Sequence, residues 1–277
     1  MRFNRITSVA NQHVRDAVQI REKRSKFSHD AFLIEGPHLL EMALNSGAGI
    51  LSVFAGEAFI NKKEHLAMLR RIAGATEDIH EVTEPVLRKI TDTETPQGIA
   101  AVVSYRMRKL TDIALRTPPL IVVIDSIQDP GNVGTIIRTA DAAGADAVVL
   151  LPGTCDAFMP KTIRSTAGSI FNIPVVASEA DRLLDWLREK NIALAITAGD
   201  AEGVIYQVDL SGPLAMVFGN EARGVSRRLR TSAVAALRIP IFGKAESLNV
   251  ATSAAICLYE IVRQRQSEPP VVRRTQG

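Results

Sequence analysis

The sequence predicts an α/β protein that is divided into two successive domains. Short apolar runs alternate with segments of helical period along nearly the whole chain, a pattern typical of strands and helices packed in layers. A length of 277 residues suits two domains, each long enough to bury a core. A basic, less periodic stretch that ends in two prolines separates the two halves of the alternation.

Residues 1–105 form the first predicted domain, a small three-layer α/β unit that opens with a basic amphipathic segment over residues 11–24. Its expected strands cover residues 31–35, 50–55, 78–82 and 99–104. Its expected helices cover residues 38–44, 62–72 and 84–90. Because the elements alternate, we expect helices on both faces of one sheet.

Residues 106–119 are the expected linker, residues 120–266 form the second domain, and residues 267–277 form a flexible tail. The expected strands of the second domain cover residues 120–125, 147–151, 173–176, 192–197, 214–218 and 237–239. The expected helices cover residues 133–143, 159–167, 180–189 and 247–264. Such an alternation favours a parallel sheet.

Composition limits where the protein works and with which partners. No apolar run approaches the roughly 18 residues that span a bilayer. The first residues lack a signal-peptide pattern, so we expect a cytoplasmic protein without membrane contact. The two cysteines, Cys155 and Cys257, are expected to be reduced and buried. All five histidines lie in the first 80 residues, where we expect structural or surface roles, and no metal site is expected.

Basic residues gather in clusters although the net charge is only +3. A single cluster is often no more than a solvated face, but several on one chain favour a polyanionic partner such as RNA. The predicted RNA contacts in the N-terminal cluster are Arg15, Arg21, Lys23, Arg24 and Lys26. RNA affinity that depends on such cations should fall as salt is added.

The first motif, DPGNVGTIIRTADAAG, follows the apolar run LIVVID and opens a helix. Its glycine-bent loop lies where α/β proteins place ligands, and it brings the carboxamide of Asn132 and the fixed cation of Arg138. Arg138 lies off the apolar stripe of the helix, so burial does not explain it. The alternative is a plain strand-to-helix turn in which Asn132 only caps the helix. Gly144 suits the helix end, where φ is often positive.

Two further motifs repeat this pattern of strand, glycine-bent loop and polar side chains. VFGNEARG places Gly219 where the backbone can approach a ligand, and it adds the carboxylate of Glu221. IPIFGKAESLNV adds Ser247, which alternatively serves as a helix N-cap. Asn249 falls inside the predicted helix, where asparagine is unfavourable unless it has another role.

The three motifs should converge, because loops at the carboxyl ends of parallel strands meet at one edge of the sheet. The site would then combine one cation, one carboxylate, amides and a hydroxyl, with neither metal ligands nor an obvious covalent nucleophile. Such groups suit transfer between two bound molecules that is catalysed largely by positioning.

The three motifs, in this order and at this spacing, resemble those of the SpoU/TrmH branch of the SPOUT RNA methyltransferases over about residues 120–265. The first hundred residues, with FLIEGPHLL and PQGIAAVV, resemble the family's L30e-like substrate-binding domain less specifically. The resemblance implies a homodimer joined through the catalytic domain and a cofactor pocket formed by a deep trefoil knot. It also implies methyl transfer from S-adenosylmethionine to a ribose 2′-hydroxyl in rRNA, above all 23S rRNA, or in tRNA.

The same resemblance assigns roles to residues of the three motifs. The adenosine pocket would be lined by Gly219, Ile239 and Leu248. The catalytic cluster would consist of Asn132, Arg138, Glu221, Ser247 and Asn249. The family's candidate for activating the hydroxyl is Arg138, but a guanidinium stays protonated. We therefore expect Arg138 to grip the adjacent phosphate and favour the developing alkoxide, with Glu221 and Asn132 fixing it in place.

Two other functions stay open on the sequence alone. A non-catalytic RNA-binding or ribosome-assembly factor with the same fold would bind RNA without transferring a methyl group. A nucleotide-dependent oxidoreductase is disfavoured, because the chain lacks the GxGxxG fingerprint and its downstream acidic partner. The sequence does not specify which RNA or which nucleotide is modified, nor whether the role is housekeeping or antibiotic resistance.

Overall fold

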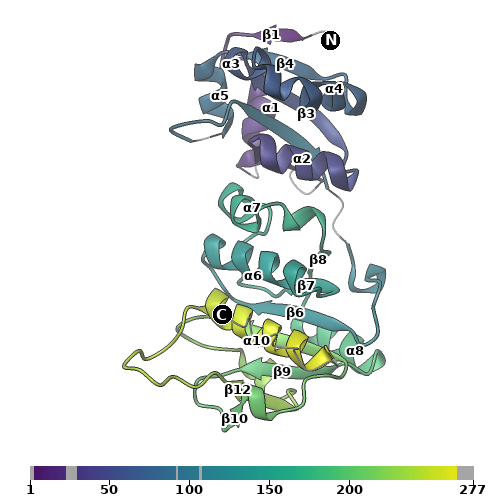
Figure 1. Ribbon diagram of the computed structural model, residues 1–277, viewed down its shortest axis with the longest axis vertical. Coiled ribbons are helices and arrows are strands. Elements are labelled where there is room, and N and C mark those ends of the chain that lie inside the picture. Colours follow the sequence, from purple (N-terminus) through teal and green to yellow (C-terminus); the bar gives the residue numbers. More distant parts are fainter. Residues whose placement is uncertain (1–2, 23–29, 92, 106–107, 267–277) are drawn as a thin grey trace, which may run out of the picture.

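The structure, a computed structural model, describes residues 3–22, 30–91, 93–105 and 108–266. These residues form two α/β units, with the N-terminal unit above the C-terminal unit in Figure 1. Each unit has one sheet with buried apolar side chains on both faces, which confirms the layered α/β class that the alternation predicts. No helix within the described ranges is long and apolar enough to cross a membrane.

The N-terminal sheet has the strand order β1-β4-β3-β5-β2, and β5 runs antiparallel to both of its neighbours. The strands are β1 (Asn4–Ile6), β2 (Ala31–Glu35), β3 (Ile50–Gly56), β4 (Ile79–Val82) and β5 (Ile99–Ser104). The helices are α1 (Gln12–Arg21), α2 (Pro37–Ser46), α3 (Glu57–Ile60), α4 (Leu66–Ala75) and α5 (Glu84–Thr91). Helices α1 and α5 cover one face, and α2 and α4 cover the other. The sequence analysis did not predict β1 and α3, which are too short to show a period.

The C-terminal sheet is parallel throughout, with the strand order β10-β12-β9-β11-β6-β7-β8. The strands are β6 (Leu120–Asp125), β7 (Ala147–Leu150), β8 (Val175–Ala177), β9 (Ala193–Thr197), β10 (Gly203–Val204), β11 (Leu214–Gly219) and β12 (Ala235–Arg238). The helices are α6 (Pro130–Ala142), α7 (Pro160–Thr166), α8 (Ala180–Glu189), α9 (Arg227–Arg230) and α10 (Val250–Arg265). Helices α6, α7 and α10 cover one face of the sheet, and α8 covers the other.

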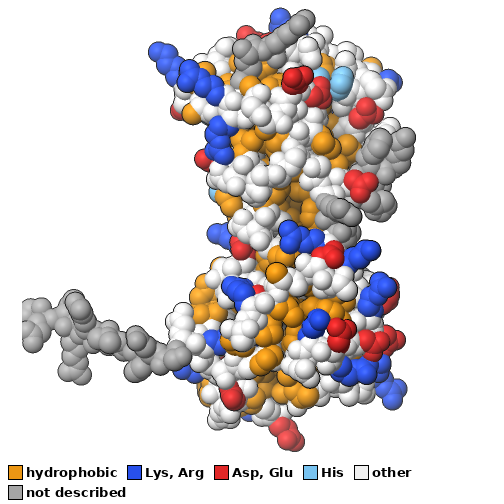
Figure 2. Space-filling model, turned by 90° about the vertical axis from the view of Figure 1, so that its right-hand side faces the viewer, with side chains coloured by type: hydrophobic (Ala, Val, Ile, Leu, Met, Phe, Trp, Pro, Cys, Tyr) orange, Lys and Arg blue, Asp and Glu red, His pale blue; other side chains and the backbone are white. Residues whose placement is uncertain are grey.

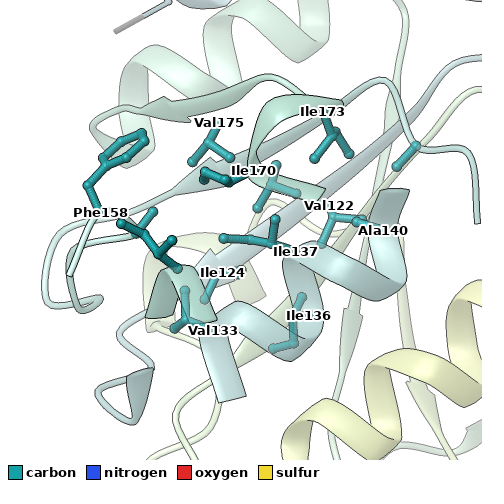
Figure 3. Close-up of a cluster of buried hydrophobic side chains, with 14 of the residues drawn as sticks. Val122, Ile124, Val133, Ile136, Ile137, Ala140, Phe158, Ile170, Ile173 and Val175 are labelled. Carbon is teal, nitrogen blue, oxygen red and sulfur yellow. The ribbon is translucent and has the colours of Figure 1, made fainter. Parts of the chain in front are cut away.

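The apolar stripe predicted for the first motif helix is buried against the sheet. Figure 3 shows the side chains of this stripe on α6 within one cluster of buried residues, with Ile137 toward Ile170 and Val122: Val133, Ile136, Ile137 and Ala140. Gly134 lets α6 and α7 pack closely, since a Cβ there would lie 2.5 Å from the Thr162 carbonyl oxygen. Gly144 has φ +70°, which confirms its expected place at the helix end. The core thus holds the helix that carries Asn132 and Arg138 rigidly.

Aromatic side chains pack where the two units meet. The ring of Phe32 lies 5.2 Å from that of Phe158 and 5.9 Å from that of Phe171, measured between centroids. Tyr105 donates a 2.9 Å hydrogen bond to the Val175 carbonyl, and burial raises the pKa of its phenol to about 12. Farther along the predicted linker, Leu110 is buried against the α8 side of the C-terminal sheet. The described residues on either side of residues 106–107 are therefore packed against the C-terminal unit.

Candidate active site

The first two motifs leave the sheet side by side. Strands β6 and β11 are neighbours, and Gly219 pairs with Asp125 at their carboxyl ends. The third motif leaves β12, which is separated from β11 by β9. Asn249, near the end of this motif, nevertheless contacts the start of α6. Residues 239–249 therefore pass from β12 toward α6, as the loop on the left of Figure 1 shows.

The amide of Asn132 joins all three motifs through two hydrogen bonds. Its Nδ2 donates to Glu221 Oε1 at 2.7 Å, and its Oδ1 accepts from Asn249 Nδ2 at 3.0 Å. A carboxylate only accepts, so Glu221 fixes which end of the Asn132 amide faces it, and the oxygen is left for Asn249. Three residues that the resemblance assigns to one catalytic cluster therefore lie together.

The caps of the two motif helices differ from those the sequence suggested. Helix α6 begins at Pro130, and its N-cap is Asp129, whose Oδ1 accepts from the Asn132 N–H at 2.8 Å. That backbone bond, together with Lys161, lowers the pKa of the Asp129 carboxyl. The side chain of Asn132 is thereby free of capping, so the plain-cap alternative is wrong.

Helix α10 begins at Val250, three residues later than predicted, and its N-cap is Asn249 and not Ser247. Asn249 Oδ1 accepts from the Ala251 N–H at 2.9 Å. The expectation of an asparagine inside the helix was wrong, because its side chain satisfies the free N–H groups of the first turn. Asn249 thus caps α10 with its oxygen and contacts Asn132 with its nitrogen.

The second motif folds into a tight loop in which backbone atoms of Gly224 and Val225 occupy the space beside Gly219. A Cβ on Gly219 would lie 2.4 Å from the Gly224 carbonyl carbon, so the glycine permits close approach of this loop's own backbone. Asn220 Nδ2 donates to the Ser126 carbonyl at 2.9 Å, and buried Asp125 accepts from the Ser226 N–H at 2.7 Å. The sequence analysis did not assign roles to Asn220 and Asp125, although an aspartate that closes an apolar strand was a usable signal.

Arg138 stands apart from the network. It is exposed on α6 and makes no hydrogen bond or ion pair with any described residue. Six residues separate it from Asn132, which is about 9 Å along a helix axis. Glu221 accepts from Asn132 and does not hold Arg138, so the expected fixing of the guanidinium by Glu221 and Asn132 is not seen. The guanidinium of Arg138 is therefore exposed to solvent and is not paired with any described carboxylate.

The remaining predicted cofactor and catalytic residues lie on or next to the loop after β12. Ser247 is exposed, and Ile239 is half-buried. Leu248 is 37% exposed beside Asn249, and Phe242 on the same loop is 90% exposed. This loop therefore leaves apolar surface uncovered next to the polar network.

A separate cleft of about 470 Å³ lies between the two units. Its lining includes Phe32, Tyr105 and Phe158 but none of the residues predicted for catalysis or cofactor binding. Half-buried Cys155 also lines it, whereas Cys257 is buried and its pKa is raised to about 12 by that burial. Both thiols are free, as expected, and a buried thiol with a raised pKa is no nucleophile.

The basic cluster of the first helix is only partly available to a partner. Arg15 is exposed on α1. Arg21 is only 7% exposed, because its guanidinium donates to the carbonyls of Lys89 and Ile90 at the end of α5. In this structure its guanidinium is therefore bound to the chain's own carbonyls and to Glu22, so Arg21 stays a predicted RNA contact that the structure does not present to solvent. The other predicted contacts, Lys23, Arg24 and Lys26, lie outside the described residues.

Known proteins match this chain over both units. The model of the SpoU rRNA Methylase family matches residues 119–259, and that of the MRM3-like substrate binding domain matches residues 11–101. A Bacillus subtilis relative, 23S rRNA (guanosine(2553)-2′-O)-methyltransferase RlmP, is 38% identical over 262 residues, which cover 94% of this chain and 99% of the relative. The 23S rRNA (uridine(2479)-2′-O)-methyltransferase of Streptomyces viridochromogenes is 31% identical, over 89% of this chain and 87% of the relative.

Solved structures agree with these matches. The AdoMet-bound rRNA methyltransferase from Sinorhizobium meliloti is 31% identical, with a TM-score of 0.84 over 94% of this chain and 98% of that one. The SpoU methyltransferase AviRb from Streptomyces viridochromogenes, in complex with AdoMet, is 28% identical with a TM-score of 0.85. The match covers 94% of this chain and 100% of that one. With its motifs joined at one edge of a parallel sheet, and with matches along both units, this chain belongs to the SpoU rRNA methylase family.

Proposed function

We propose that this protein transfers a methyl group from S-adenosylmethionine to the 2′-hydroxyl of a ribose in rRNA, with 23S rRNA as the first candidate. The observation that carries the proposal is the hydrogen-bonded set of Asn132, Glu221 and Asn249, which unites the three motifs. The names of the two 23S rRNA methyltransferases above support the substrate class.

The loops around this set fit S-adenosylmethionine. Ile239 and Leu248 offer apolar surface to an adenine ring, and the backbone around Gly219 offers hydrogen-bonding groups beside it. When bound, the cofactor supplies a methyl group that is already activated on sulfur. The passage of residues 239–249 from β12 to α6 supports the trefoil knot that the resemblance implies.

The chain's own side chains then place the ribose. Glu221 and Asn249 hold the Asn132 amide in one orientation, which fixes the relative positions of the three motif loops. Arg138, a permanently charged group that no described side chain neutralises, binds a phosphate of the RNA. A cation at that position also stabilises the alkoxide that develops as the 2′-hydroxyl releases its proton to solvent and its oxygen takes the methyl group from sulfur.

The active form is a homodimer through α10 and the adjoining surface of α6. Ile256 and Tyr259 of α10 are 39% and 53% exposed although α10 packs on α6. Burying these side chains against a second copy removes apolar surface from water. It would also bring Arg138, which makes no hydrogen bond or ion pair with any described residue, near the symmetry-related site.

Light scattering of Ile256→Asp tests the dimer. A charge at the centre of the interface should give a monomer at micromolar concentration. Leu66→Asp is the matched control, because Leu66 is 49% exposed on the N-terminal unit. A monomeric wild-type protein would end the dimer proposal and leave the methyl transfer to be judged by itself.

The methyl transfer is tested with labelled S-adenosylmethionine and rRNA, followed by mapping of 2′-O-methyl groups in RNA from cells with and without the protein. One ribose should gain its methyl group only when the protein is present.

RNA binding without any methyl transfer would instead favour the non-catalytic alternative. Calorimetric binding of NAD but not of S-adenosylmethionine would favour an oxidoreductase. The predicted cytoplasmic location goes with this substrate and is checked by cell fractionation.

A further inference from the structure

Two histidines and an aspartate meet on the N-terminal unit, far from the three motifs. His13 lies on α1, Asp78 directly precedes β4, and His80 lies on β4. His80 Nε2 is 3.0 Å from Asp78 Oδ1, and His13 Nδ1 is 3.9 Å from Asp78 Oδ2. One ligand atom from each of the three residues lies within 4.8 Å of the others. Figure 2 shows histidine surface beside acidic side chains on this unit.

His80 has an unusual environment for a polar side chain. It is only 1% exposed, yet neither of its ring nitrogens makes a well-formed hydrogen bond to any described residue. Native proteins rarely leave such a group unsatisfied, so the position calls for an explanation. The sequence analysis expected every histidine to be structural or exposed, and a buried imidazole without a satisfied partner fits neither role well.

Two further ligand groups lie beside His80. Asp78 supplies a carboxylate beside it, and the ring of His13 lies 4.5 Å away between centroids.

We propose that His13, Asp78 and His80 bind a divalent transition-metal ion, with Zn²⁺ as the fitting ion. In a tetrahedral zinc site with bonds of about 2.1 Å, the ligand atoms lie about 3.4 Å apart. One ligand atom from each of the three residues lies within 4.8 Å of the others, so the partly exposed side chains of His13 and Asp78 need only small shifts to reach that spacing. Two imidazoles with a carboxylate select zinc-like ions over Mg²⁺ and Ca²⁺, which take oxygen ligands.

The surroundings also suit an ion that enters from solvent. The side chains of His13 and Asp78 are 52% and 37% exposed, which leaves an open path and room for a water ligand. The ion would join α1 to β4 and so fix the helix that carries Arg15. The competing interpretation is a simple ion pair of Asp78 with His80, which would bind no metal and would leave His13 without a role.

Calorimetry with the full-length, tag-free protein tests the site after chelator treatment. Titration with ZnCl₂ should show one saturable site, and Co²⁺ should give the intense visible absorption of a four- or five-coordinate ion. His13→Gln and Asp78→Asn change partly exposed positions and leave the core intact. Each should weaken binding more than about tenfold, since even indirect partners of metal ligands contribute that much.

His38→Gln is the matched control, because His38 is an exposed histidine on α2 of the same unit, and its binding should equal that of the wild type. S-adenosylmethionine affinity should be unchanged in all three variants, which separates this test from that of the proposed function. The proposal is overturned if the wild type shows no saturable Zn²⁺ site, or if His13→Gln binds Zn²⁺ as tightly as His38→Gln does.

Discussion

The two units of the molecule present their polar side chains in different ways. In the C-terminal unit, Asn132, Glu221 and Asn249 come from three distant segments: the first two follow adjacent parallel strands, and residues 239–249 carry Asn249 from β12 to α6. In the N-terminal unit, Arg15 and Arg21 lie on one helix, yet only Arg15 faces solvent and Arg21 reaches back to carbonyls of α5. The contrast teaches that sheet topology constrains polar residues more tightly than a count of charges, because a long arginine side chain can satisfy itself on its own chain.

The largest effect is expected from Arg138→Ala, which removes the exposed cation that α6 carries six positions beyond Asn132. Turnover should fall about 10²-fold or more, because positioning of the ribose is lost. S-adenosylmethionine affinity, measured by calorimetry, should be unchanged. Arg138→Lys keeps the charge but loses the bidentate grip, so near-normal activity in that variant would count against the phosphate clamp. Arg188→Ala, on α8 at the opposite face of the sheet, is the control and should be fully active.

Gly219→Ala probes how tightly the second motif is folded. The added Cβ would lie 2.4 Å from backbone carbon of Gly224, so something must move, at a cost of about 1–3 kcal/mol in unfolding free energy. Denaturant titration measures this loss, and cofactor affinity should fall with it. Gly199→Ala is the control, because Gly199 follows the neighbouring strand β9 and a Cβ there would have no atom within 4 Å. The denaturant midpoint of this variant should equal that of the wild type. Equal midpoints for both variants would contradict the crowding.

Asn249→Asp separates the two tasks of one side chain. The substitution keeps an oxygen to cap α10, but it places the Asn132 amide between two carboxylates that both need its Nδ2. We expect unchanged helix stability and about a tenfold loss of turnover, which matches one hydrogen bond of roughly 1.4 kcal/mol. Asn172→Asp creates a similar carboxylate pair with Asp141 away from the site and should retain activity. Full activity of Asn249→Asp would show that the network has no catalytic role.

The smallest effect sharpens the contrast within α1. Arg15→Ala should weaken rRNA binding a few-fold and reduce the salt slope by about one. Arg21→Ala should leave the salt slope alone and lower the free energy of unfolding by about 1–3 kcal/mol, because the carbonyls at the end of α5 lose a charged donor. Filter binding at several salt concentrations and thermal melts distinguish the two variants. A reversed pattern would mean that Arg21 turns outward when RNA binds.

Secondary structure was predictable wherever a segment carries a period. The buried strand β6 has the predicted bounds, and the striped helix α6 lies where the pattern places it but begins at Pro130 and ends at Ala142, against the predicted 133–143. Helix starts were less predictable, because aspartate, asparagine and serine are all favourable N-cap residues and each loop contains more than one of them. The N-caps are Asp129 for α6 and Asn249 for α10, and not Asn132 and Ser247. Strand β10 has two residues, too few for any alternation to be visible.

The α/β class and the three glycine-bent loops were readable from the chain alone, because periodicity and turn chemistry are local, and their convergence was expected because loops that follow parallel strands leave at one edge. Only the tertiary structure decided which atom of Asn132 faces Glu221, that Arg21 turns toward α5, and that His13 comes beside His80. Each of these contacts requires two segments, distant in the sequence, to come within hydrogen-bonding or ring-contact distance of each other. That approach is decided by the packing of whole layers, and no local pattern of residues encodes it.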